Sequence, residues 1–154
     1  ADTIGLGTNV ESAQTSVNVR YTSFADSTLG SNDSVSATVG ISGGFVLSQT
    51  VVTATTAAGL ANSEFTTDSG GVVTFTGTFA GDVTARATSL DGALSSGQAA
   101  LFADSAGTDY FFIQGGSASG GTGDDLLVSL NTGTVAGSGA MRIAGGTSIS
   151  FQMA

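Results

Sequence analysis

Residues 71–79, Gly-Val-Val-Thr-Phe-Thr-Gly-Thr-Phe, indicate the class of fold, because apolar and hydroxyl side chains alternate along them. Val73, Phe75 and Phe79 fall on one side of an extended chain, and the threonines between them fall on the other. A period of two residues is typical of a β-strand with one buried face and one solvated face. We therefore expect a half-buried strand here.

The same alternation recurs in other parts of the chain. It runs through residues 15–23, 34–42 and 148–153. Residues 45–56 are apolar on both faces at their start, which favours a central strand. Together these stretches predict a protein built mainly of strands.

Glycine pairs separate the predicted strands, and glycine supplies the positive φ angles that tight turns need. The pairs stand at residues 43–44, 70–71, 115–116, 120–121 and 145–146. We predict an all-β fold: a β-sandwich or two-sheet roll of roughly seven to nine mostly antiparallel strands. Residues 1–154 form a single β-rich domain in this interpretation.

One stretch departs from the β-pattern and shows the spacing of a helix. Its apolar stripe consists of Val83, Ala87, Leu90 and Leu94. Asp82 and Ser89 are both candidate N-caps, and Gly97 is a candidate stop. We predict one short helix near residues 89–95.

The composition argues against an enzyme. The chain of 154 residues contains no His, Cys, Pro, Trp or Lys. General acid–base catalysis most often uses His, thiolate chemistry needs Cys, and Schiff-base chemistry needs Lys. A serine nucleophile would have no basic partner, and a pair of sugar-cleaving carboxylates would lack Trp stacking platforms. A structural or binding protein is therefore expected.

The charge excludes further classes of partner. Net charge is −9, and the only cationic residues are Arg20, Arg86 and Arg142. No basic surface is available for nucleic acid, and no apolar run approaches the roughly 18 residues of a membrane span. We expect neither partner. An acidic surface keeps copies apart by repulsion, which salt or a divalent cation relieves.

Residues 120–128, Gly-Gly-Thr-Gly-Asp-Asp-Leu-Leu-Val, fit the nonapeptide pattern G-G-x-G-x-D-x-U-x. Such repeats wind a β-roll that holds Ca²⁺, an ion that prefers carboxylate and backbone oxygens. Asp124 and Asp125 are therefore candidate calcium ligands. The pattern occurs once, whereas a β-roll site takes ligands from the neighbouring turn. The alternative is a glycine-rich hairpin loop with two solvated aspartates.

Asp104 and Asp109 flank a second acidic turn. If the strands next to the two turns pair, all four aspartates would converge on one Ca²⁺ ion. The alternative for Asp104 and Asp109 is ordinary turn chemistry, in which aspartate accepts hydrogen bonds from nearby backbone.

Residues 97–135, together with the helix predicted just before them, combine several of these motifs. The elements are a helix at 90–95, a strand at 100–103, an acidic turn at 104–109, an aromatic strand at 110–114, a glycine-rich loop at 115–123 and a strand at 125–130. From about residue 83 to 154, the chain resembles the C-terminal segment of bacterial surface-layer and type I-secreted, repeat-in-toxin-like proteins. The resemblance implies secretion without a cleaved N-terminal signal, an extracellular location and a lattice or sheath role.

These observations lead to two expectations for function. The first is an extracellular or cell-surface structural subunit that self-assembles with copies of itself into a filament, sheath or surface-layer-like lattice. Residues 148–153 alternate to the end of the sequence, so we expect the terminal strands to pair between subunits. The alternative is a calcium- or glycan-binding adhesion module whose partner is a cell-surface glycan.

Overall fold

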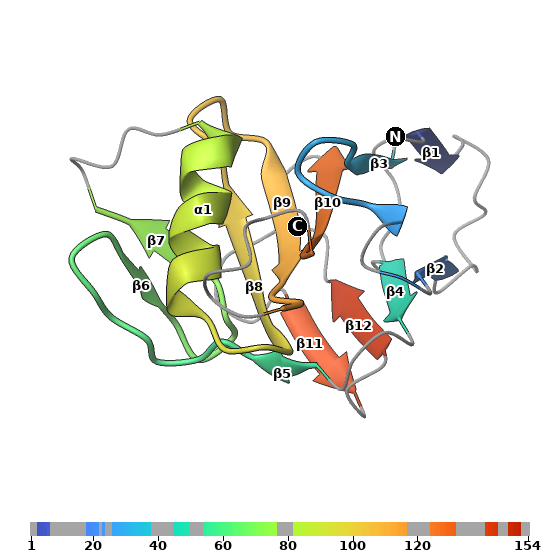
Figure 1. The fold of residues 1–154 in the computed structure, drawn as a ribbon. Coiled ribbons are helices and arrows are strands. Elements are labelled where there is room, and N and C mark those ends of the chain that lie inside the picture. The colour runs from blue at the N-terminus through green and yellow to red at the C-terminus, as the bar shows by residue number, and fades with distance from the viewer. Residues whose placement is uncertain are drawn as a thin grey trace.

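The computed structural model describes residues 3–6, 18–21, 23, 26–37, 45–49, 54–76, 82–116, 124–131, 141–144 and 148–151. Side chains are described for residues 23, 26–34, 54–76, 82–116 and 124–130. Over these residues the chain forms twelve strands and one helix (Figure 1). In chain order they are β1 (Thr3–Leu6), β2 (Asn18–Tyr21), β3 (Asp33–Ala37), β4 (Phe45–Gln49), β5 (Thr55–Thr56), β6 (Phe65–Thr67), β7 (Val73–Phe75), α1 (Val83–Ala93), β8 (Gln98–Ala103), β9 (Asp109–Ile113), β10 (Leu126–Asn131), β11 (Met141–Ala144) and β12 (Ser148–Phe151).

The largest layer is a six-stranded sheet in the order β1-β3-β10-β9-β8-β5. Its central pairings, β8 with β9 and β9 with β10, are antiparallel. The outer pairings, β1 with β3, β3 with β10 and β5 with β8, are parallel. Parallel neighbours need a long crossover, and the crossover from β5 to β8 contains α1. The prediction of a β-rich fold with one helix is confirmed, and this sheet is mixed rather than wholly antiparallel.

The remaining strands form two smaller sheets. One has four strands in the order β11-β12-β4-β2, and the other is the β6–β7 hairpin. The predicted strand at 45–56 is divided between sheets, because β4 belongs to the four-stranded sheet and β5 to the six-stranded one. β4 does lie between two neighbours, β12 and β2, as a central strand should.

The helix begins earlier than predicted. It covers Val83–Ala93 instead of residues 89–95, and Asp82 rather than Ser89 is the N-cap. The Asp82 side chain accepts a hydrogen bond from the Ala85 backbone N–H at 3.1 Å, which satisfies one of the free donors of the first turn. Gly97 follows the helix with a φ of 85°, in the region that favours glycine.

The core lies between α1 and the centre of the six-stranded sheet. Figure 1 shows α1 crossing one face of β8 and β9. The buried residues of this cluster are Ala57, Phe65, Val73, Ala87, Leu90, Leu94, Ala100, Phe102, Tyr110, Phe112 and Leu127. The alternate residues Leu101, Phe111 and Val128 are buried as well, so the central strands are apolar on both faces.

A long-range connection joins an early segment to β10. Ser27 is fully buried, and its carbonyl accepts from the Leu127 N–H at 2.9 Å. The Ser27 hydroxyl donates to the Leu127 carbonyl and accepts from the Asp33 N–H at 2.8 Å. One serine therefore fixes where β3 meets β10.

The described strand β7 covers only Val73–Phe75 of the strand expected at 71–79. In β7, Val73 is buried and Thr74 exposed, as predicted, but Phe75 is only partly buried. Its ring packs edgewise against Phe65 and Phe102 with centroid distances of 5.7 and 6.2 Å. The Arg86 guanidinium lies 5.0 Å from the ring centroid. Phe79 and Thr78 lie outside the described residues.

Several other predictions concern residues that are described only in part. Strands form within residues 15–23, 34–42 and 148–153. Most of their side chains are not among those described, so the predicted inward and outward faces stay predictions. Gly71 has a φ of 78° in the β6–β7 connection, as a turn requires. The glycine pairs at 43–44, 120–121 and 145–146 are not among the described residues. Across the described part of the chain, no helix has the length and apolarity needed to cross a membrane.

Candidate metal centre

Three aspartates gather at one end of the core. Oxygen atoms of Asp91, Asp124 and Asp125 lie within 4.8 Å of one another. Asp125 is fully buried, Asp91 is 5% exposed, and Asp124 is partly buried. Carboxylates are among the side chains least often buried unless they are paired, so this grouping requires a physical explanation.

The fold brings these residues together from two parts of the chain. Asp91 lies in the last turn of α1, and Asp124 and Asp125 directly precede β10. Leu126 pairs with Ile113 in the sheet, which places the end of β9 beside the start of β10. In Figure 1 the end of α1 and the starts of β8 and β10 lie at the lower end of the six-stranded sheet.

Gln114 links the helix to the sheet at this point. Its side chain is fully buried, and Nε2 donates to Asp91 Oδ1 at 2.9 Å. Its backbone continues the β8–β9 ladder, with its N–H on the Gln98 carbonyl at 3.0 Å and its carbonyl accepting from Gly97 at 2.7 Å. The amide group therefore has a fixed position next to the carboxylates.

Asp125 and Asp124 are held by the two glycines after Gln114. The Gly115 N–H donates to Asp125 Oδ1 at 2.8 Å. Asp124 packs directly on Gly116, since a Cβ built on that glycine would lie 1.6 Å from Asp124 Oδ2. The glycine pair at 115–116, predicted as a turn, thus also makes room for a carboxylate.

The cluster has more hydrogen-bond acceptors than donors. Four buried side-chain polar atoms lack a partner among the described residues, and three are oxygens of this site: Gln114 Oε1, Asp124 Oδ1 and Asp125 Oδ2. Buried acceptors without partners are costly, typically by about 1–3 kcal/mol each. A cation or additional hydrogen-bond donors would satisfy these oxygens.

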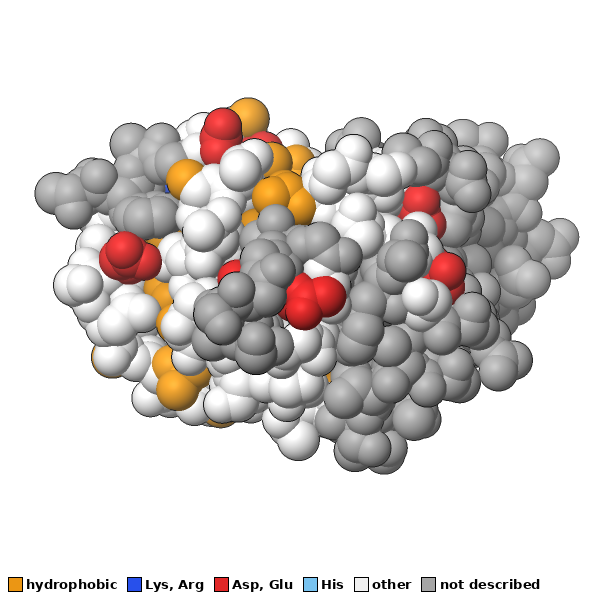
Figure 2. All heavy atoms as spheres, viewed as in Figure 1, with side chains coloured by type: hydrophobic (Ala, Val, Ile, Leu, Met, Phe, Trp, Pro, Cys, Tyr) orange, Lys and Arg blue, Asp and Glu red, His pale blue; other side chains and the backbone are white. Residues whose placement is uncertain are grey.

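The described part of the site also has an excess of negative charge. The pKa of Asp125 is raised to about 6. Burial is the largest cause, the hydrogen bond from the Gly115 N–H opposes it, and the charges of Asp91 and Asp124 add to the rise. Arg86 is the only cationic residue whose side chain is described, and it is occupied elsewhere. Its guanidinium covers Phe75 and donates to the Ala103 carbonyl. Figure 2 shows the described acidic side chains of one face, with little basic surface among the described residues beside them.

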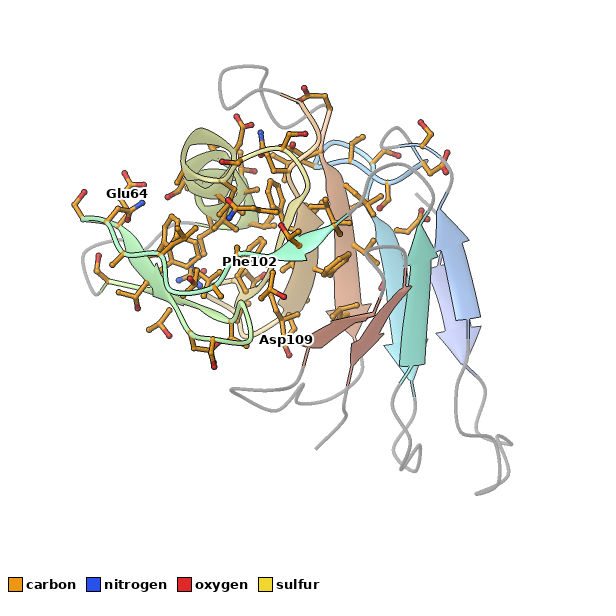
Figure 3. The ribbon with its side chains drawn as sticks, turned by 90° about the horizontal axis from the view of Figure 1, so that it is seen from below. Glu64, Phe102 and Asp109 are labelled. Atoms are coloured by element: carbon orange, nitrogen blue, oxygen red, sulfur yellow. The ribbon has the colours of Figure 1, made fainter. Side chains whose placement is uncertain are left out.

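The four aspartates predicted from the sequence do not form one site. Asp124 and Asp125 belong to the cluster, but Asp109 pairs with Leu130 at the far end of β9 from Ile113 and Leu126. Figure 3 shows Asp109 on the side of the sheet away from α1. The two acidic turns lie at opposite ends of paired strands, so their predicted convergence on one ion is wrong.

Asp104 instead forms the β8–β9 turn. Its Oδ1 accepts from the Ala106 and Thr108 backbone N–H groups at 2.8 and 2.9 Å. The Tyr110 hydroxyl donates to Oδ2 at 3.4 Å. This is the turn chemistry that was the alternative prediction for the second acidic turn.

Two members of the cluster were missed by the sequence analysis, Asp91 and Gln114. Asp91 stands four residues after Ala87 and three before Leu94, so it falls on the apolar stripe of the helix. An acidic residue on a buried stripe was the available signal. Gln114 gave no comparable signal, because its position depends on tertiary packing.

Comparisons of the chain with protein-family models, with curated proteins and with solved structures find no match. The resemblance to surface-layer and repeat-in-toxin-like segments stays a prediction.

Proposed function

We propose that this chain is a non-catalytic structural subunit of an extracellular surface, and that its copies associate into a filament, sheath or lattice through an edge of the six-stranded sheet. The observation that carries the proposal is the composition of β1, which ends that sheet in the order of the described strands.

β1 has the properties of an edge that accepts another strand. Among the described strands its one neighbour is β3, so its other side is directed away from the sheet. Its sequence, Thr-Ile-Gly-Leu, has no charge and no proline. Natural sheets block unwanted pairing with charges, prolines or very short edge strands. None of these devices is present in β1.

The other edges of the two larger sheets carry such devices. β2 and β11 end the four-stranded sheet, and they contain Arg20 and Arg142 respectively. β5, at the opposite end of the six-stranded sheet, has only two residues. The contrast favours β1 as the contact strand.

The C-terminal strand is a weaker candidate for exchange between subunits. β12 pairs with β11 on one side and with β4 on the other, both within the same chain. We therefore propose intersubunit pairing through β1 and not through the C-terminal strand.

The test compares the assembly of three proteins, the unaltered chain and two lysine variants. Negative-stain microscopy and analytical ultracentrifugation measure the assembly of each. Gly5→Lys introduces a charge in β1, and Thr84→Lys introduces the same charge at an exposed position of α1. We expect ordered polymers for the unaltered chain and for Thr84→Lys, and monomers for Gly5→Lys. Monodisperse particles of the unaltered chain at all concentrations would refute the proposal and favour an adhesion module, which glycan-array binding would then test.

A further inference from the structure

We propose that Asp91, Asp124 and Asp125 bind one Ca²⁺ ion, with Gln114 Oε1 as a neutral fourth ligand, and that the ion fastens the end of α1 to the start of β10. This inference goes beyond the proposed assembly and does not depend on it, because all four residues belong to one chain.

The first argument is the number of unpartnered acceptors. Gln114 Oε1, Asp124 Oδ1 and Asp125 Oδ2 all lack a hydrogen-bond partner among the described residues. A proton shared between two carboxylates would satisfy two of the oxygens and leave the amide oxygen without a donor. A single cation accepts all of them at once. The fully buried amide oxygen of Gln114 is therefore an indication of a cation that is independent of the acidic residues.

The second argument is the position of Asp91 in the helix. The last turn of an α-helix carries a partial negative charge, so a carboxylate there is unfavourable and a cation is favourable. Asp91 lies in that turn of α1, which contains no basic residue. Asp91 is also 5% exposed, so water screens this repulsion poorly. A divalent cation would offset both the helix dipole and the three carboxylates.

The donor set selects the kind of ion. All the available ligands are oxygens, which suit Ca²⁺ or Mg²⁺ and not soft metals. Two ligands of one Ca²⁺ ion lie at most about 5 Å apart, since each bond is about 2.3–2.6 Å long. The oxygens of Asp91, Asp124 and Asp125 lie within 4.8 Å of one another, so they meet that condition. Mg²⁺ dehydrates reluctantly, so a largely buried site favours Ca²⁺.

The experiment measures thermal unfolding of the full chain after treatment with EDTA, then with Ca²⁺ or Mg²⁺ added. A ligand that binds the folded state alone raises Tm, and at a hundredfold excess over Kd we expect a rise of about 5–10 °C. Equilibrium dialysis with ⁴⁵Ca²⁺ gives the stoichiometry, which we expect to be about one ion per chain. The Mg²⁺ response should be much smaller.

Asp91→Asn and Asp82→Asn are matched variants at the two ends of the same helix. Asp82 is the N-cap, and Asn caps helices equally well, so this control removes one negative charge without removing the cap. We expect Asp91→Asn to lose the calcium response and Asp82→Asn to keep it. If Asp91→Asn does not fold, the dialysis stoichiometry of the unaltered chain decides.

Two results would overturn the proposal. One is the same Tm in EDTA and in Ca²⁺ with no bound ⁴⁵Ca²⁺, which would mean that the cluster holds protons. The other is an equal loss of response in both variants, which would mean that Ca²⁺ only screens the acidic surface.

Discussion

The carboxylate of Asp124 rests against the backbone of Gly116, at a distance that leaves no room for even a methyl group. A Cβ on Gly116 would lie 1.6 Å from Asp124 Oδ2 and 2.7 Å from Cγ. Because the carboxylate ends a flexible side chain, Gly116→Ala should turn Asp124 away from the cluster and leave the fold intact. We expect at least about a tenfold loss of calcium affinity, with metal-free stability changed by about 1 kcal/mol or less. Calcium titrations and denaturant melts in EDTA measure the two effects.

Gly92 provides the matched glycine control. It lies inside α1, it is exposed, and a Cβ there meets nothing within 4 Å. Gly92→Ala should raise the free energy of unfolding by about 0.5–1 kcal/mol, since alanine is the better helix former. Calcium affinity should stay unchanged. A loss of affinity in this variant would show that the helix end adjusts its position on binding.

The hairpin offers a direct test of graded burial. Phe65 is fully buried, Phe75 is partly buried, and Thr74 is exposed. We expect Phe65→Ala to cost about 3–5 kcal/mol, Phe75→Ala about 1.5–2.5 kcal/mol and Thr74→Ala at most about 0.5–1 kcal/mol. Urea denaturation of the three variants gives the order. Equal losses of stability for Phe65→Ala and Phe75→Ala would contradict this order. They would mean that Phe75 is buried by more than its contacts with Phe65, Phe102 and Arg86.

Asp125 should make the metal-free protein less stable as the pH rises. Its pKa is raised from 3.8 to about 6 by burial in the folded state, so folding favours the neutral carboxyl. The stability from that neutral form is complete below pH 3.8 and lost as pH rises through about 6, by roughly 3 kcal/mol at most. Melts in chelator from pH 4 to 7 should show this decline, and Asp125→Asn should flatten it. A variant that declines as steeply as the unaltered chain would assign the effect to other groups.

Parts of the fold could be predicted because their determinants are local. Alternation marks Val73 and Thr74 on opposite faces, and Asp82 was already one of two candidate N-caps. The sequence predicts a helix start near residue 89 rather than at Val83, and Gly92 weakens the helical pattern. Burial of Ala87 against the sheet outweighs the low helix propensity of that glycine.

Other parts could not be predicted because they depend on distant residues. Nothing in residues 45–56 shows that β4 and β5 join different sheets, since both segments are simply extended. At the site, the nonapeptide pattern singled out Asp124 and Asp125, but their neighbours come from α1 and the end of β9. Gln114 became a candidate ligand only when its buried amide was placed beside Asp91.

The attachment of Ser27 to Leu127 has a consequence for how the chain folds during synthesis. The two residues are 100 positions apart, and β3 completes its parallel pairing only when β10 exists. Closing so large a loop is slow, and sheets built on distant pairings fold slowly for that reason. The first half of the chain therefore emerges from the ribosome without the strand that anchors it. We expect the unfolded state to persist until the segment from residue 124 onward has been released.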